Sequence, residues 1–363
     1  MIDRRLFTHF DWAILSVILG LICIGFASIY SATHIHMPMI YTKDIYWIGI
    51  GAGMMLLAII FSYSYLERFA YIIYGSSIAL LISVFFIGSS FSGAKRWISL
   101  GFFTLQPSEF AKLALIIMLA KYFNEKLISD KGMGLKDLAV PAVIMIVPFL
   151  LIAKQPDLGT GIILWMIFWS MAFVVKIRAR VIMGLGAFFA ALAPFGWMFL
   201  KDYQKARITS FMSPESDPLG SGYHVMQSKI AIGSGGFLGK GFMEGTQGKL
   251  MFLPEHHTDF IFAVLAEEWG LIGAMVVLGL FLALIISGIN TAGSSKDRFG
   301  FLVAFGITAM FFWQVFINLG MVAGIMPVVG VPLPFISYGG SFLITSMIAA
   351  GILLNINMRR FIF

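Results

Sequence analysis

The stretch from Leu250 to Gly270, LMFLPEHHTDFIFAVLAEEWG, places six ionisable side chains at the start of an apolar run. Asp259 is the acid of greatest chemical interest, because a carboxylate held where water meets hydrocarbon is costly unless something uses it. Two interpretations stay open. Asp259 accepts a proton in a reaction, or it lies in the first turn of a helix and only complements the helix dipole.

A helix that begins at Asp259 would carry a face of small residues. These residues follow Asp259 at offsets of 4, 7 and 11: Ala263, Ala266 and Gly270. Such a face leaves room for a ligand chain or for a closely packed helix, and the sequence does not decide between them. Because successive residues turn by about 100°, Glu267 and Glu268 do not pair with Asp259. We expect these two acids to face a polar cavity.

A second group of charges lies at the fourth apolar run, after the stretch Gln106-Pro107-Ser108. Ser108 is placed to cap a helix, and Glu109 and Lys112 then share one face and form an ion pair. Intramembrane charges are candidates for function, although a structural bridge to another helix explains this pair equally well.

Three more candidates precede or follow this group, and each has an ordinary alternative. Lys95 and Arg96, beside Trp97, fit an anchor at the membrane interface or a pair of cations that holds a phosphate. Asp157, in QPDLGT, is an acid at a helix start, where an N-cap is the simpler interpretation.

Other patterns point to no site. The Gly-rich stretch 233–248 lacks the spacing of a P-loop and is expected to be a flexible loop that can approach a substrate. His256 and His257 are adjacent and therefore diverge in regular structure, so a zinc site is not predicted. No Ser-His-Asp or Cys-His set can be assembled.

Composition indicates a polytopic, all-α membrane protein. The chain has 363 residues, is 59% hydrophobic and 12% charged, and has a mean hydropathy of +0.92. A soluble core cannot absorb that much apolar surface, whereas a bundle of membrane-spanning helices can. The single cysteine, Cys23, excludes an intramolecular disulfide.

Ten apolar runs predict ten transmembrane helices in a single domain, 1–363. The runs are 12–31, 45–61, 69–88, 108–123, 138–153, 158–175, 181–200, 259–288, 299–324 and 338–357. The segment 324–337 contains Pro327, Pro332 and Pro334, so it cannot be regular helix. We expect a re-entrant or surface-lying loop packed on protein.

The basic residues predict the orientation. With a cytoplasmic N-terminus, the inner segments hold fourteen of them: Arg4, Arg5, Arg68, Lys121, Lys126, Lys131, Lys136, Lys176, Arg178, Arg180, Lys296, Arg298, Arg359 and Arg360. The short outer segments hold Lys43, Lys95, Arg96 and Lys154. Both termini are therefore expected in the cytoplasm, with a large extracellular loop, about 201–258, between helices 7 and 8. The net charge of +7 reflects this inner basic rim and does not indicate nucleic acid.

Four motifs in order along the chain resemble the SEDS family of bacterial cell-wall synthases: GAKRWI with QPSEFAK, QPDLGT, LPEHHTDFIFAVLAEEWG and PVVGVPLPFISYGGS. The short N-terminus and Pro327-Val328-Val329-Gly330 are more similar to the elongation branch, RodA, than to the division branch, FtsW. The resemblance implies a peptidoglycan glycosyltransferase in the bacterial cytoplasmic membrane that polymerises lipid II outside the membrane. It also implies a class B penicillin-binding protein and other elongation-complex membrane proteins as partners.

The resemblance further implies that Asp259 is catalytic. It marks several other positions as functional, with less settled roles: Trp97, Glu109, Lys112, Asp157 and Ser341. Many relatives have Arg or Ala where His256 stands, so that position is given no catalytic role.

The residues fit this chemistry. Transfer from an α-linked lipid diphosphate to form a β-1,4 bond needs one base, and the leaving diphosphate needs positive charge. Lys95, Arg96 or Lys112 could supply that charge, or a divalent cation such as Mg or Mn. Two rivals stay open: a lipid II flippase that uses Asp259 or the Glu109–Lys112 pair as a proton relay, and a scaffold without catalysis.

Overall fold

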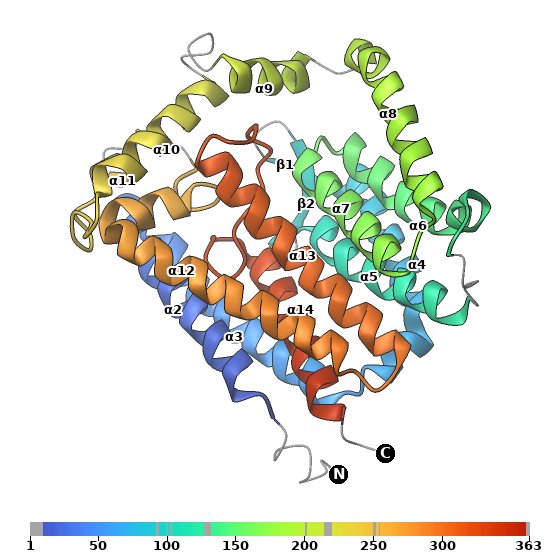
Figure 1. Cartoon of the computed structure of the whole chain (residues 1–363). Coiled ribbons are helices and arrows are strands. Elements are labelled where there is room, and N and C mark those ends of the chain that lie inside the picture. The colour runs from blue at the N-terminus through green and yellow to red at the C-terminus, as the bar shows by residue number, and fades with distance from the viewer. Residues whose placement is uncertain are drawn as a thin grey trace.

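Each of the ten predicted apolar runs coincides with one helix of the computed structural model (Figure 1). The structure describes residues 10–91, 94–99, 101, 104–126, 132–199, 202–213, 220–249, 252–253 and 255–360. The helices are α2 (Trp12–Thr33), α3 (Pro38–Ile60), α4 (Ser64–Ile87), α5 (Pro107–Glu125), α6 (Leu135–Lys154), α7 (Leu158–Val174), α8 (Ala179–Phe199), α12 (Ile261–Gly293), α13 (Arg298–Val322) and α14 (Gly340–Arg359).

Seven of these helices are long and apolar enough to cross a bilayer: α2, α3, α4, α6, α12, α13 and α14. Over their most apolar stretches, 89% of the residues in α14 and 72% in α13 are buried, against 17% in α3 and 22% in α4. The first pair therefore forms the centre of the bundle, whereas the second pair presents its apolar side chains outward. The chain is a multi-pass membrane protein.

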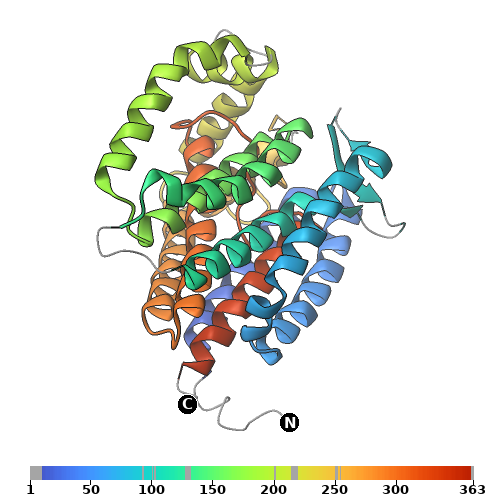
Figure 2. The same ribbon diagram turned by 90° about the vertical axis from the view of Figure 1, so that its right-hand side faces the viewer.

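One end of the bundle carries the irregular structure. The start of α2 and the end of α14 lie together at the opposite end (Figures 1 and 2). A small antiparallel sheet, β1 (Ser89–Phe91), β2 (Ala94–Ser99) and β3 (Thr104–Leu105), connects α4 to α5 in the order β1-β2-β3. The all-α prediction missed these strands, because they are short and glycine interrupts the sequence around them.

The described parts of the segment between α8 and α12 are mostly helical. It contains α9 (Asp202–Met212), α10 (Ser221–Gly235) and α11 (Thr246–Lys249), and α8 to α10 arch over one end of the bundle (Figure 1). Within the Gly-rich stretch 233–248, residues 236–245 form a loop, as predicted, while its two ends belong to α10 and α11. Gly235 approaches α12 so closely that a Cβ there would lie 2.1 Å from the carbonyl oxygen of Ala266.

Helix α12 is broken at Gly270, whose φ of 64° and ψ of −161° lie outside the helical region. A break inside apolar surroundings leaves backbone groups that need partners. The segment after α10 supplies them through four backbone hydrogen bonds: Lys240 N to Glu267 O (3.0 Å), Gly241 N to Glu268 O (3.0 Å), Leu271 N to Gly236 O (2.9 Å) and Ile272 N to Phe237 O (3.3 Å).

The side chains of Glu267 and Glu268 belong to the same junction. Glu267 is fully buried and accepts hydrogen bonds from Lys240 Nζ (2.6 Å), Thr246 N (2.9 Å) and Gln247 N (3.1 Å). Glu268 accepts one from Ser31 Oγ at 2.5 Å. Glu267 therefore faces protein donors and not the predicted polar cavity, whereas Glu268 borders a surface hollow that Phe242 and Trp269 also line. Ala263 and Ala266 are buried, and Gly235 of α10 packs closely on Ala266, so this face takes the closely packed helix among the described residues.

Replacing Gly270 with alanine should destabilise the fold by about 2–4 kcal/mol, through left-handed backbone strain and a clash. The new Cβ would lie 2.3 Å from Gly239 N and 2.7 Å from Phe237 O. Thermal unfolding of the purified protein in detergent measures the effect. The matched control is Gly279→Ala in the same helix, where a Cβ meets nothing within 4 Å. Equal melting temperatures for the two variants would contradict the interpretation of the junction.

Candidate active site

Asp259 lies in the turn before α12, two residues ahead of Ile261. The N-cap position belongs to Phe260, and no side chain caps the helix there. The Asp259 side chain is partly exposed, and among the described residues its carboxylate accepts no hydrogen bond. Only its backbone oxygen is held, by Asn318 Nδ2 at 2.9 Å. Asp259 therefore neither lies in the first turn nor caps it, which removes the ordinary structural role considered above.

The proline-rich segment 324–337 packs along this turn. As expected, it is not helical, since α13 ends at Val322 and α14 begins at Gly340. Ser337 Oγ donates to Thr258 O at 2.6 Å, and Asn318 Nδ2 also donates to Val331 O at 2.8 Å. Gly330 has a φ of 75°, and a Cβ there would lie 3.2 Å from Asp259 Oδ2. The segment thus forms one wall of the space beside the carboxylate.

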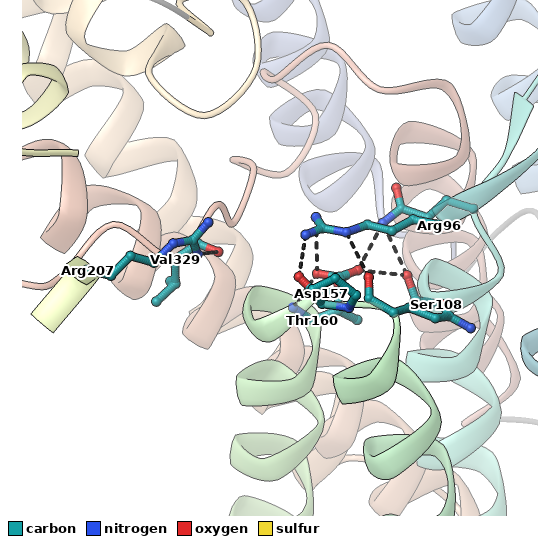
Figure 3. A network of polar contacts seen from close by, with 9 residues as sticks. Arg96, Ser108, Asp157, Thr160, Arg207 and Val329 are labelled. Atoms are coloured by element: carbon teal, nitrogen blue, oxygen red, sulfur yellow. Dashed lines mark hydrogen bonds and ion pairs between the residues drawn. The ribbon is translucent and has the colours of Figure 1, made fainter. Parts of the chain in front are cut away.

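Asp157 is the centre of a second group, drawn in Figure 3. It caps α7, as predicted, by accepting from Thr160 N (3.3 Å) and Thr160 Oγ1 (3.0 Å). It also accepts from Ser108 Oγ and Gln106 Nε2, both at 3.2 Å. Ser108 does not cap α5, which the sequence predicted; its hydroxyl is directed to Asp157 instead. Asp157 therefore joins the starts of α5 and α7.

Arg96 reaches this group from β2. Its Nη1 lies 3.9 Å from Asp157 Oδ1, and its guanidinium donates to the carbonyl oxygens of Gln155 and Pro156 (Figure 3). Strand β2 is irregular at this point, because Ser89 pairs with Trp97 and Ser90 with Lys95, which leaves Arg96 as an extra residue between the two pairs. Lys95 is exposed. Of the predicted outer cations, Arg96 is the one that faces Asp157.

The backbone at 329–330 lies between Asp157 and Asp259. A Cβ on Gly159, two residues after Asp157, would lie 2.8 Å from the carbonyl oxygens of both Val329 and Gly330. From the other side, Arg207 Nη1 of α9 donates to Val329 O at 3.3 Å (Figure 3). The sequence did not indicate Arg207, because it lies outside every motif and in the long loop that was left out of the charge comparison.

Glu109 and Lys112 form the predicted ion pair, with 2.7 Å between Lys112 Nζ and Glu109 Oε2. Their side chains are only 4% and 3% exposed, and Lys112 Nζ also lies 5.1 Å from the centre of the Phe342 ring. Nearby, Ser341 Oγ accepts from Gln106 N at 3.0 Å and donates to Thr104 O at 3.2 Å. These residues join α5 to the start of α14 beside the Asp157 group.

The FtsW/RodA/SpoVE family model, described as cell cycle protein, matches residues 7–361. The chain belongs to this family. It is 42% identical to peptidoglycan glycosyltransferase MrdB of Escherichia coli (strain K12) over 353 residues, 97% of this chain and 94% of that protein. It is 34% identical to peptidoglycan glycosyltransferase RodA of Treponema pallidum (strain Nichols) over 430 residues, 97% of this chain and 98% of that protein.

Solved structures agree with this membership. A chain from a study of the structural coordination of polymerization and crosslinking by a peptidoglycan synthase complex superposes with a TM-score of 0.84 at 33% identity, covering 98% of this chain and 99% of that one. The crystal structure of the rod shape determining protein RodA of Thermus thermophilus gives a TM-score of 0.72 at 28% identity, with 97% and 98% covered.

The charges around Asp259 tune its acidity. Burial among its neighbours, and to a smaller extent the negative charge of Glu255, raise the pKa of the Asp259 carboxyl to about 7. Arg207 opposes the rise, and smaller contributions come from Asp157, which raises the pKa, and Arg96, which lowers it. A base is most effective when its pKa lies near the working pH, so this SEDS-family carboxylate is suited to proton transfer.

The acids near Asp259 do not fit a metal site made of protein ligands alone. Within the described ranges, no three side chains of His, Cys, Asp or Glu come together in a way that could hold a metal ion. The positive charge that acts on Asp259 comes from Arg207 and Arg96.

Replacing Asp157 with alanine should lower stability by about 2–3 kcal/mol, because it removes a helix cap and leaves buried donors without their acceptor. Asp157→Asn keeps one acceptor oxygen and should cost less. The thermal unfolding of the two variants tests this order. An alanine variant as stable as the wild type would show that the Asp157 group does not hold α5 and α7 together.

Proposed function

We propose that this SEDS-family chain is a peptidoglycan glycosyltransferase that polymerises lipid II into β-1,4 glycan strands during cell elongation and releases undecaprenyl diphosphate. One observation supports it above the others. Asp259 is a partly exposed carboxylate that accepts no hydrogen bond from the described residues, and burial and Glu255 raise its pKa to about 7. The relatives named as peptidoglycan glycosyltransferases cover nearly the whole chain.

In this proposal the single domain, 1–363, crosses the membrane ten times. The seven long apolar helices are joined by α5, α7 and α8, and an even number of crossings agrees with the shared end at which α2 begins and α14 ends. The excess of basic residues places that end in the cytoplasm. Asp259 then faces outward, at the outer surface of the bacterial cytoplasmic membrane, where lipid II and the growing lipid-linked glycan are present.

The reaction needs one base. Asp259 takes the proton from the 4-hydroxyl of the acceptor GlcNAc, and the oxygen attacks C1 of the MurNAc at the end of the growing chain. The O4–C1 bond forms as the bond from C1 to the diphosphate oxygen breaks, so the configuration inverts and the electron pair leaves with the diphosphate. A glycosidase that inverts needs a second carboxyl as acid because its leaving group is poor, whereas diphosphate leaves without one.

Positive charge must stabilise the departing diphosphate. Arg96 and Arg207 both influence the acidity of Asp259 and are anchored on backbone carbonyl groups around it. A guanidinium presents five N–H donors in a planar fork that matches the geometry of a phosphate group. Lys112 is paired with Glu109 inside the bundle, so we assign these two, with Asp157 and Ser341, to positioning the substrate site. The substrate-binding roles of Lys95 and Trp97 stay predictions.

A class B penicillin-binding protein is the expected partner, since a polymerase must deliver its strands to a transpeptidase that crosslinks them. The similar chain from a peptidoglycan synthase complex supports this expectation. Other elongation-complex membrane proteins are expected in the same assembly.

Asp259→Asn should reduce glycan polymerisation from lipid II by at least about 100-fold, because the amide cannot accept the proton. Wild-type activity should rise about tenfold per pH unit below pH 7 and level off above it, since the ionised carboxylate is the active form. Gel analysis of glycan ladders made by purified protein, with and without its partner and a chelator, measures both.

The fold of the Asn variant can be checked by its stability. A pKa raised in the folded state means that the native protein holds this proton more tightly than the unfolded chain does, so wild-type stability falls as the pH rises from about 4 to 7. The Asn variant should therefore gain stability relative to the wild type over that range. If a well-folded Asp259→Asn protein made glycan ladders at the wild-type level, Asp259 would not be the base. If the wild-type protein transported lipid II but made no ladders, the flippase function would be favoured.

Arg207→Gln should lower polymerisation about 10- to 100-fold, mainly in kcat, if its charge acts on the departing diphosphate. Lys205→Gln, on the same helix, removes an equal charge, and among the described hydrogen bonds it is Arg207 and not Lys205 that donates to Val329 O. Comparing the two variants at several lipid II concentrations separates a local effect from a change in net charge. Equal losses of polymerisation activity in the two variants would show that the net positive charge of α9 causes the effect and not the position of Arg207.

A further inference from the structure

An apolar cavity of about 230 Å³ lies between α14, the end of α3 and the start of α4. Ile352 of α14 forms its inner wall and is 4% exposed, whereas Leu57 and Phe61, which also line it, are 47% and 61% exposed. Exposed apolar side chains at a membrane-spanning helix face lipid tails and not water. The cavity therefore opens toward the hydrocarbon of the bilayer.

Asn355 of α14 fixes the rim of this cavity. Its Nδ2 donates to Ile59 O at 2.6 Å and to Phe61 O at 2.8 Å, and its Oδ1 accepts from Tyr63 N at 3.1 Å. These three bonds hold the turn between α3 and α4 against α14. The cavity is thus bounded by backbone that is tied in place.

Arg359 continues the same face of α14. Ile348 and Ile352 line the cavity, and Asn355 and Arg359 follow Ile348 at offsets of 7 and 11, so the four share one face of the helix. The partly exposed Arg359 side chain donates from Nη2 to Ile60 O at 3.0 Å. The guanidinium is therefore held next to the rim of the cavity.

The charge of Arg359 is not neutralised by the described residues. None of their carboxylates forms an ion pair with it. The two acids that influence the neighbouring Tyr63 have other partners: Asp297 accepts from Tyr63 OH at 3.0 Å, and Glu67 accepts from Asn124 Nδ2 at 2.7 Å. An ordinary role for Arg359 is to complement the dipole at the end of α14. That role leaves its charge available to an anion from outside the chain.

We propose that this cavity and Arg359 together bind one anionic phospholipid, with a fatty-acyl chain in the cavity and the phosphate on the guanidinium. A helix with its side chains is about 10–12 Å wide, which is too wide for this cavity, whereas a single acyl chain can enter it. The planar fork of arginine matches two phosphate oxygens. Tyr63 and Tyr65, which line the cavity, suit the level of the lipid headgroups.

The orientation expected from the basic residues supports the same ligand. It places the end of α14 at the cytoplasmic leaflet, where anionic lipids give the membrane surface a negative potential. The site does not depend on glycosyl transfer, since the cavity lies among α3, α4 and the second half of α14, away from the turn that carries Asp259.

Two pairs of variants separate the headgroup from the tail. Arg359→Gln removes the cation, and Arg360→Gln is its control, because Arg360 Nη1 donates to Ser294 Oγ at 3.1 Å, at the end of α12. Leu57→Trp fills the cavity from an exposed position. Leu56→Trp is its control, because Leu56 is 56% exposed and does not line the cavity.

Binding is measured on the purified full chain in neutral detergent. Native mass spectrometry compares phosphatidylglycerol, which is anionic, with phosphatidylcholine of the same acyl chains, and melting temperatures are recorded in parallel with inorganic phosphate as a further ligand. Wild-type protein should bind phosphatidylglycerol at least about fivefold more tightly than phosphatidylcholine and melt about 2–4 °C higher with it.

The variants should divide that result. Arg359→Gln should lose the preference for phosphatidylglycerol, and Arg360→Gln should keep it. Leu57→Trp should weaken the binding of both lipids by about tenfold, since it excludes the acyl chain, and Leu56→Trp should bind as the wild type does.

Equal binding of the two lipids by the wild type would overturn the proposal, because the cavity would then lack a headgroup site. Equal losses in Arg359→Gln and Arg360→Gln would do the same, by assigning the effect to the net positive charge at this end. So would equal stabilisation by inorganic phosphate, which has no acyl chain. If Arg359→Gln does not fold, the comparison of Leu57→Trp with Leu56→Trp still decides, and none of these measurements uses lipid II.

Discussion

Non-helical backbone inside a membrane bundle must have every polar group paired, and this constraint shapes the end of the protein that carries Asp259. Three irregular segments meet there: the Asp259 turn, the proline-rich segment 324–337 and the break at Gly270. Backbone groups of the 236–241 segment complete the break, and side chains such as Asn318 and Ser337 complete the other two. Without these partners each exposed N–H or C=O would cost several kcal/mol in hydrocarbon, about 2–7 by transfer estimates.

The same constraint produces a site whose polar groups are fixed before a substrate arrives. Arg96 and Arg207 are each anchored on carbonyl oxygens that irregular backbone leaves available. The Asp157 group joins β2, α5 and α7, and Ser341 joins the start of α14 to the segment before α5. Fixed charges of this kind do not have to reorganise when charge develops on a substrate, which is the condition for electrostatic catalysis.

The sequence predicted the helices well because long apolar runs leave few alternatives in a bilayer. It also predicted the cap at Asp157, the pair Glu109–Lys112 and the non-helical proline segment, all of which depend on neighbours along the chain. Contacts between residues that lie far apart in the sequence could not be predicted. Nothing local shows that Gly235 packs on Ala266, that Ser108 turns to Asp157, or that Arg207 approaches Val329. The strands β1 to β3 were missed because their pairing needs a partner strand and not a periodic run.

Hydrogen bonding sorts the acids at this end into different roles. Glu267 is surrounded by donors from the 240–247 segment, and Asp157 by donors from α5 and α7. A carboxylate so occupied is fixed in place and cannot accept a proton without losing those bonds. Glu255 lies in the open and accepts only from Thr258. Asp259 alone among these four acids combines partial burial with a carboxylate that accepts no hydrogen bond within the described chain. Of these four acids, Asp259 is thus the one available as a base. The proposed transfer requires a single base, because diphosphate leaves without the help of a general acid.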